Sequence, residues 1–180
     1  MIKQPFLLAV MAILLLSCVA CKNKQTTGVV QLPHQEEEEV YDPFVDGNRK
    51  IVALEDEEID LFLKRYGWNT EKTGTGLRIE MVKEGSGGCP MAGQTVTLQY
   101  KTMLLSGDVV YSSDESGDLV FVVDKSNDVA GLHEAVKRMK KGAAARVVIP
   151  AHLAYGVGGD GDRIKGRKPI AMYLELIDIK

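Results

Sequence analysis

One stretch near the end of the chain, residues 146–159, constrains the fold more than any other and reads RVVIPAHLAYGVGG. It begins with β-branched residues that are typical of a strand, and Pro150 ends this strand because proline has no N–H to donate to a sheet ladder. A single tyrosine, Tyr155, then comes before a run of glycines. We interpret Tyr155 as a hydrogen-bond donor at the lip of a pocket, between a sheet edge and a loop. The alternative is an ordinary half-buried anchor of the loop.

From residue 77 onward, apolar and polar residues alternate with the period of two that is typical of strands. Apolar residues also fall on one face of a single helix expected over residues 131–141, where Glu134 stands near the start and lysines near the end. The fold class is therefore α+β, with an antiparallel sheet of five to six strands wrapped around one short helix. The strands are expected near residues 77–81, 96–100, 109–111, 119–123, 144–149 and 170–179.

The N-terminal residues predict export from the cytoplasm. A positively charged start precedes an apolar run over residues 6–16, which is too short for a transmembrane helix of roughly 20 residues and fits a secretory signal. The sequence LLSC that follows resembles a bacterial lipoprotein signal, so residues 1–17 are predicted to be a signal peptide and Cys18 the lipidated residue. Cys21 is the competing lipid site, and a plain signal peptide is the other alternative. The expected location is the cell envelope, with a membrane-anchored chain facing the periplasm or the outside.

Two segments separate this signal from the strands. Residues 18–48 are polar and irregular, contain a run of four glutamates, and are expected to form a flexible acidic tether. Residues 49–76 are predicted to be a helical extension, because residues 55–66 place apolar side chains on one helical face and Gly67 follows as a stop signal. This face must be buried against the following domain or against a second copy of the chain, so a homodimer through residues 55–66 is one alternative.

Composition and spacing exclude several kinds of function. The formal net charge is −3 without a basic stripe, so nucleic acid is not an expected partner. His34, His133 and His152 are scattered and are interpreted as solvated surface residues, so no metal site is expected. The sequence contains no recognisable serine–histidine–aspartate set, no paired carboxylates with an obvious partner and no phosphate-binding glycine loop. We therefore expect neither a nucleophilic mechanism nor a cofactor.

Four segments, in this order, resemble the FKBP-type peptidyl-prolyl isomerases: VTLQYKTMLLSGDVVYSS, GLHEAVKRMKKG, ARVVIPAHLAYGVGG and YLELIDI. The resemblance covers residues 77–180 and implies an FKBP-like isomerase domain there. The upstream signal, acidic spacer and helix ending in Tyr-Gly-Trp resemble the FKBP-like lipoproteins of gliding-motility type from bacteria. The implied activity is cis–trans isomerisation of X–Pro bonds in exported proteins, with proline-containing polypeptides as partners.

The resemblance also implies which residues form the site. Tyr155 is the implied hydroxyl donor at the lip, the backbone N–H of Val129 the implied donor to a substrate carbonyl, and Tyr100 an implied pocket wall. The family usually has an aspartate where Tyr111 stands and an aromatic floor where Leu132 stands, so we expect an apolar but less aromatic pocket with weaker activity. Macrolide immunosuppressants are expected to bind it poorly. The substrate-binding positions implied are Val110, Tyr111, Leu119, Phe121, Leu132, Ile164 and Met172.

Such a pocket can accelerate isomerisation without a nucleophile. Rotation about an X–Pro bond faces a barrier of roughly 18–20 kcal/mol because amide resonance must be lost. The carbonyl is less polarised in the twisted transition state, so an apolar pocket favours the twisted form. Two other functions remain as alternatives. One is a non-catalytic FKBP-like binding or chaperone module with a degraded pocket, and the other is a structural lipoprotein whose N-terminal helix is the main interaction surface. For Phe121 and Leu132, simple core packing is also an alternative to a pocket role.

Overall fold

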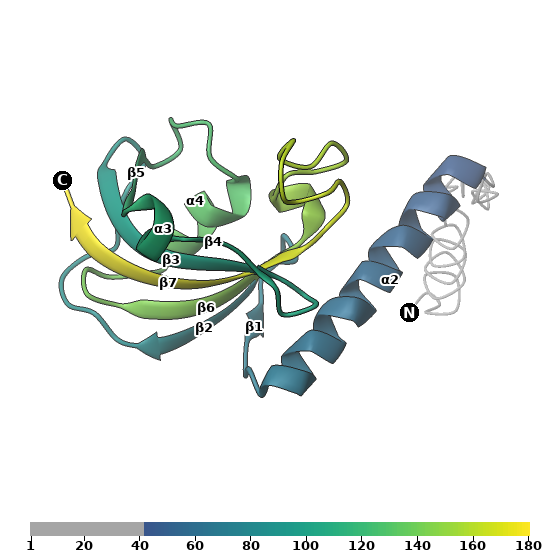
Figure 1. The fold of residues 1–180 in the computed structure, drawn as a ribbon, viewed down its shortest axis with the longest axis horizontal. Helices are drawn as coiled ribbons and strands as arrows, with labels where there is room; N and C mark the ends of the chain where they lie inside the picture. The colour runs from purple at the N-terminus through teal and green to yellow at the C-terminus, as the bar shows by residue number, and fades with distance from the viewer. Residues whose placement is uncertain (1–41) are drawn as a thin grey trace, which may run out of the picture. The chain divides into compact units, whose positions relative to one another are not determined.

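A curved antiparallel sheet of seven strands organises residues 42–180, which are the residues that the computed structural model describes (Figure 1). The strand order is β1-β2-β6-β7-β3-β4, and β5 pairs with β3 beside this path. The sheet has more strands than expected from the sequence because the two-residue β1 adds an edge. The strands are β1 (Glu71–Lys72), β2 (Arg78–Lys83), β3 (Thr95–Leu104), β4 (Val109–Ser112), β5 (Leu119–Val122), β6 (Ala144–Ile149) and β7 (Ile170–Ile179).

The alternation along β3 separates the two faces of the sheet. Val96 and Leu98 are fully buried in the main core, and Tyr100 continues the same face toward the end of the strand. Met103 points to the opposite face and belongs to a second apolar cluster. We call the first face the inner face and the second the outer face. The inner face carries the main core, whereas the outer face is covered only where the second cluster lies, and Gln99 and Lys101 on β3 are exposed.

The inner face packs on a short helix, α4 (Ala130–Val136), around which the sheet curves in Figure 1. The contact is close, because a Cβ added to Gly131 would come within van der Waals overlap of the Ile149 side chain. The helix is shorter than the expected span of residues 131–141. Beyond Val136, Met139 N–H bonds the Val136 carbonyl at 3.0 Å, which is the tighter three-residue pattern, and it turns the fully buried Met139 into the core. Two further short helices, α3 (Ser113–Ser116) and the 3₁₀ helix η1 (Ala151–Leu153), were not expected.

One end of the outer face is covered by α2 (Pro43–Tyr66), a helix of 24 residues that starts earlier than expected from the sequence. Asp42 caps it by accepting a hydrogen bond from Phe44 N–H at 2.8 Å, and proline occupies the first turn, where a missing N–H is harmless. Residues 43–48, which the sequence assigned to the tether, are therefore helical. The helix ends at Gly67, whose φ of 64° suits glycine.

The C-terminal half of α2 is anchored to the sheet. Ile59 and Phe62 are buried in the second cluster, so the apolar face predicted for residues 55–66 is covered by the chain's own sheet. The buried Arg78 on β2 pairs with Asp56 at 3.2 Å and Asp60 at 3.1 Å on the helix. Among residues 42–180, no helix combines the length and apolar character that a bilayer crossing requires. The expected signal peptide, both candidate lipid sites, His34 and the tether before residue 42 lie outside the described residues.

Candidate functional site

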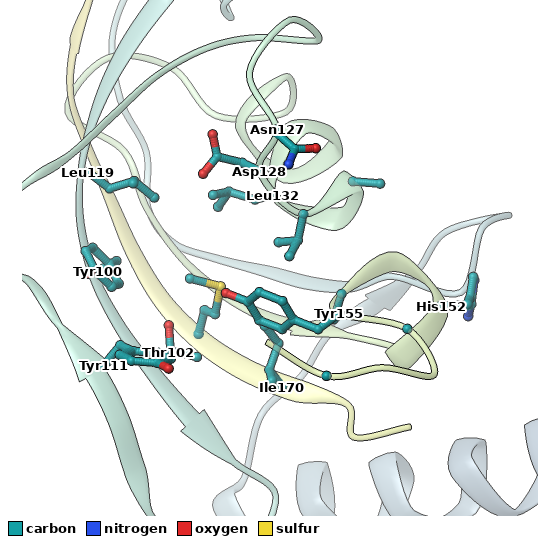
Figure 2. A pocket seen from close by; sticks show the side chains of 16 residues that line it. Tyr100, Thr102, Tyr111, Leu119, Asn127, Asp128, Leu132, His152, Tyr155 and Ile170 are labelled. Atoms are coloured by element: carbon teal, nitrogen blue, oxygen red, sulfur yellow. The ribbon is translucent and has the colours of Figure 1, made fainter. Parts of the chain in front are cut away.

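A hollow of about 770 Å³ opens over the inner face, between the start of α4 and the loop that follows η1 (Figure 2). Strands β3 and β7 supply its base, β4 and β5 one side, and the loop its other side. The structure brings most of the expected site residues together here, although they come from six different parts of the chain. The expected residues that line the hollow are Tyr100, Tyr111, Leu119, Val129, Leu132, Tyr155 and Met172.

Three expected pocket residues lie elsewhere. Val110, Phe121 and Ile164 are buried in the main core and are not among the residues that line the hollow. Phe121 instead meets the ring of His133 edge-on, with centroids 5.0 Å apart. Val110 contributes its backbone, because its carbonyl accepts a hydrogen bond from Arg163 at 2.6 Å. Leu132 belongs to both groups, since it is almost fully buried and also forms part of the hollow's wall.

Tyr155 lies on the loop after η1, and Figure 2 shows its ring reaching into the hollow between Leu132 and Ile170. Two backbone bonds shape this loop: Gly156 N–H donates to the Ala151 carbonyl at 2.8 Å, and Arg167 N–H donates to the Gly156 carbonyl at 2.7 Å. The side chain is 36% exposed, so its hydroxyl can be reached from solvent.

Burial raises the pKa of the Tyr155 hydroxyl, and the nearby carboxylates of Asp160 and Asp128 act in the same direction. The hydroxyl therefore keeps its proton at neutral pH and can act as a hydrogen-bond donor.

Val129 stands on the other side of the hollow as the N-cap of α4. Its backbone is extended, with φ −64° and ψ 136°, and its carbonyl accepts the Leu132 N–H at 2.9 Å. Its own N–H has no hydrogen-bond partner among residues 42–180. Because unpaired N–H groups at the start of a helix attract carbonyl oxygens, Val129 offers a second donor to the hollow.

Tyr111 meets an acid that the sequence did not indicate. Its hydroxyl donates to Asp160 Oδ2 at 2.5 Å, so a carboxylate absent from position 111 comes from the loop on the far side. The guanidinium of Arg163 lies over the Tyr111 ring, 5.3 Å from its centroid, and also bonds β4. Asp160 Oδ1 accepts the N–H groups of Asp162 and Ile164, each at 2.9 Å. The loop over residues 160–164 is thereby tied to β4.

The same contacts shift two ionisation equilibria. The hydrogen bond to Asp160 raises the pKa of Tyr111 to about 12, with burial as a further cause. Burial opposes ionisation of Asp160, but its hydrogen bonds from Tyr111 and from two backbone N–H groups outweigh burial and lower the pKa of this carboxyl. At neutral pH the pair is therefore a neutral donor and a charged acceptor, which is the strong form of such a bond.

Sequence reasoning also missed part of the lining. Thr102 lies two residues after Tyr100, and Ile170 two residues before Met172, so a strict period of two would have found both. The remaining missed residues carry no such signal, because their place depends on how two loops fold. They are Asn127, Asp128, Ala130, His152, Ala154, Gly156 and Gly159.

One interpretation of the histidines is wrong. His133 is buried rather than solvated: its Nδ1 accepts the Asp124 N–H at 3.1 Å, and its Nε2 lies 3.2 Å from the Ser126 carbonyl. It thus fastens the loop before α4. His152 is exposed, as expected, with Nε2 at 3.0 Å from the Thr75 carbonyl. In the part of the chain from residue 42 to 180, no three acidic, histidine or cysteine side chains are grouped so that they could hold a metal ion.

A curved antiparallel sheet around a short helix, with a tyrosine at the lip of a hollow over the inner face, is typical of the FKBP-type class of domain. A family model described as FKBP-type peptidyl-prolyl cis-trans isomerase matches residues 87–177. The chain belongs to this family.

Individual relatives agree with the match. FkpA, a peptidyl-prolyl isomerase of Escherichia coli, is 34% identical over 122 residues, which cover 66% of this chain and 43% of FkpA. FK506-binding protein 1 of Dictyostelium discoideum is 31% identical over 106 residues, which cover 58% of this chain and 99% of that protein. The crystal structure of Escherichia coli FkpA superimposes with a TM-score of 0.63 at 27% identity, covering 76% of this chain and 64% of that one. The chain thus spans less than half of the curated FkpA sequence.

Proposed function

We propose that residues 77–180 catalyse cis–trans isomerisation of X–Pro bonds in polypeptides, and that the hollow binds the proline. The observation that carries the proposal is the pair of donors, the Tyr155 hydroxyl and the Val129 N–H, on two sides of one hollow whose base and walls include the apolar side chains of Leu132, Ile170 and Met172. Membership of the FKBP-type family supports it.

The chemistry follows from the properties of the amide. Its rotation barrier of roughly 18–20 kcal/mol comes from resonance, which also polarises the carbonyl and attracts water to it. Tyr100, Leu132 and Met172 offer a surface with little polarity to the proline ring and its amide. A bound peptide would displace water from this surface. The polarised carbonyl of the planar amide would then lose more hydration free energy than the less polarised carbonyl of the twisted amide, which lowers the barrier between them. Each 1.36 kcal/mol of this difference is worth a factor of ten in rate.

The two donors act by orientation. Tyr155 and the Val129 N–H would bind carbonyls of the peptide that flank the rotating bond, so that one side of that bond is held while the other turns. Tyr155 is not an acid catalyst in this scheme, because its raised pKa keeps the proton on the hydroxyl. Aliphatic side chains take places where aromatic rings are usual in the family, so we expect weaker activity and poor binding of macrolide immunosuppressants.

A proline-limited refolding assay on the full chain tests the proposal. We expect Tyr155→Phe to lower kcat/KM about tenfold, the value of one hydrogen bond of about 1 to 1.5 kcal/mol, and Leu132→Ala to lower it further in the double variant. Met91→Ala serves as control, since this residue is 69% exposed and outside the hollow. If the wild type accelerates refolding no more than the double variant does, the isomerase proposal fails.

The second candidate is a non-catalytic binding or chaperone module of the same fold. It is favoured by the exposed apolar residues on α2, among them Phe44 at 84% and Leu54 at 66% exposure. Suppression of aggregation that survives Tyr155→Phe and Leu132→Ala, without any acceleration of refolding, would support this candidate instead.

We also propose that the chain is anchored in the cell envelope through a lipid on Cys18 and acts there on exported proteins. The motifs that support this are the signal-like residues 1–17 and the LLSC sequence. A relative from Legionella longbeachae, 32% identical over 106 residues, is named outer membrane protein MIP. In this proposal the tether runs from Cys18 to the start of α2. Mass spectrometry of the mature N-terminus decides between Cys18, Cys21 and an unlipidated end.

A further inference from the structure

A second hollow of about 390 Å³ lies between the N-terminal half of α2 and the loop after η1. We call it the helix groove. Its apolar surface comes from Ile51, Val52 and Leu54 on the helix and from Val157 on the loop. Val52 is 53% exposed, Leu54 66% and Val157 74%, so a surface that is apolar on both sides faces solvent. Apolar residues gathered in this way mark an interaction site more often than apolar residues scattered singly.

The groove continues the apolar stripe of α2, which includes Ile59 and Phe62 and anchors the helix to the sheet. Steps of three and four residues lead from Phe62 back through Ile59 to Val52, so all three lie on one face of the helix. The sheet covers Ile59 and Phe62, but the helix then runs past the sheet and the loop takes the sheet's place. The C-terminal part of the apolar stripe is therefore covered by the sheet, and its N-terminal part, at Val52, is exposed.

A hydrogen bond joins the two walls of the groove and fixes their relative position. Glu55 on α2 accepts a hydrogen bond from the Ala151 N–H at 2.5 Å, at the base of the loop. This bond fixes the helix beside the loop. The Arg167 N–H bonds the Gly156 carbonyl at 2.7 Å and fixes the loop from its other side. A preformed groove binds a ligand without first paying the entropy of ordering its own walls.

The groove adjoins the hollow proposed to bind proline. His152 and Gly156 line both, and Tyr155 at the lip of one is two residues from Val157 in the other. An extended polypeptide advances about 3.3 Å per residue, so a chain with its proline beside Tyr155 can place a side chain in the helix groove a few residues away. The two hollows therefore share part of the loop after η1, on which one client segment could contact both.

From this shared lining we infer that the helix groove is a second subsite for the client polypeptide, which takes a bulky apolar side chain close in sequence to the isomerised proline. The inference rests on the proposed isomerase function. The groove is small and one wall is a single exposed loop, so it suits one or two side chains of an extended segment, whereas a stable protein interface buries about 1,200 Å² or more. The α2 helix thereby gives the isomerase domain a preference for unfolded apolar segments over isolated X–Pro bonds.

The test compares two probes on the full chain. The first is a four-residue peptide with a Leu-Pro bond, which fills only the proline hollow. The second is a set of twelve-residue peptides with the same bond and one phenylalanine moved through the positions on either side. The variant is Val52→Ser with Val157→Ser. Val82→Ser with Val120→Ser is the matched control, because these valines are 54% and 59% exposed and line neither hollow.

We expect the best phenylalanine position to lower KM for the wild type, and the Val52→Ser, Val157→Ser variant to raise it again about fivefold, as the loss of two buried apolar contacts implies. The four-residue peptide should be isomerised equally by all three proteins. Equal KM values of variant and control for every long peptide would overturn the subsite, while lack of isomerisation of the short peptide by the wild type would instead overturn the isomerase function. Sedimentation tests a further outcome. If the wild type is a dimer, the Val52→Ser, Val157→Ser variant is a monomer and KM is unchanged, the subsite proposal fails and the groove binds a second copy of the chain.

Discussion

The hydrogen bond between Tyr111 and Asp160 should stabilise the protein measurably, because it ties the loop at the edge of the hollow to β4. The perturbation is a double-mutant cycle of Tyr111→Phe and Asp160→Asn. The pKa of Tyr111 is raised from 10 to about 12. This shift means that the folded protein stabilises the protonated hydroxyl relative to the deprotonated one by about 2.7 kcal/mol. Solvent reaches both partners, so screening reduces the expected coupling energy to about 1 kcal/mol.

The coupling should depend on pH in a defined way. The pKa of Asp160 is lower in the folded protein than in the unfolded chain, where it is near 4. Its contribution to the free energy of unfolding is therefore present above about pH 4 and is lost as the pH falls through the folded-state pKa. Tyr111 has a raised pKa, so its contribution is full below about pH 10 and is lost as pH rises toward 12. The difference in unfolding free energy between wild type and Tyr111→Phe is therefore expected to be flat from about pH 5 to 9 and to shrink at both ends.

Urea unfolding followed by the fluorescence of Trp68, the single tryptophan, gives these free energies. Trp68 lies in the second apolar cluster, away from the mutated pair, so its signal reports global unfolding. Additive effects of the two substitutions, within about 0.3 kcal/mol, would show that the bond does not contribute and would refute the reasoning.

Three further predictions concern the packing that positions the site. Phe62→Ala should destabilise the chain by about 3 to 5 kcal/mol, because it opens a cavity between α2 and the sheet, and urea unfolding would show it. Arg78→Met should cost about 1 to 3 kcal/mol in the same assay, because Asp56 and Asp60 lose a buried partner, and an unchanged midpoint would contradict this. Gly131→Ala should lower the melting temperature through overlap with Ile149, and the double variant with Ile149→Ala should lose less stability than the sum of the two single variants.

Local periodicity explains which parts of the fold could be predicted from sequence. The strands and α4 were found because side chains repeat every two or every three to four residues on covered faces. The start of α2 was missed, although Asp42 followed by Pro43 is a recognisable N-cap and first turn. Gly47 and the preceding acidic run argued against a helix there, and no periodicity within residues 43–48 outweighed them.

The candidate site was predictable only where the family pattern or the strand period applied. Tyr155, Tyr100 and Leu132 lie in the hollow as the resemblance implied. The partnership of Tyr111 with Asp160 joins residues 49 apart in the chain, and no local signal connects them. The partners of His133 are close in sequence, nine and seven residues away, but only the folded loop before α4 shows which carbonyl and N–H its ring meets.

The central claim is that the hollow isomerises X–Pro bonds, and exchange NMR on a Leu-Pro peptide mixed with the full chain tests it most directly. The method reads the rate of interconversion of the cis and trans peptide signals, and the amide signals of the protein report where the peptide binds. We predict faster exchange, slowed about tenfold by Tyr155→Phe, with the largest shifts at Val129 and Tyr155. Peptide binding at these residues without any acceleration of exchange would contradict the account, and so would acceleration that Tyr155→Phe leaves unchanged.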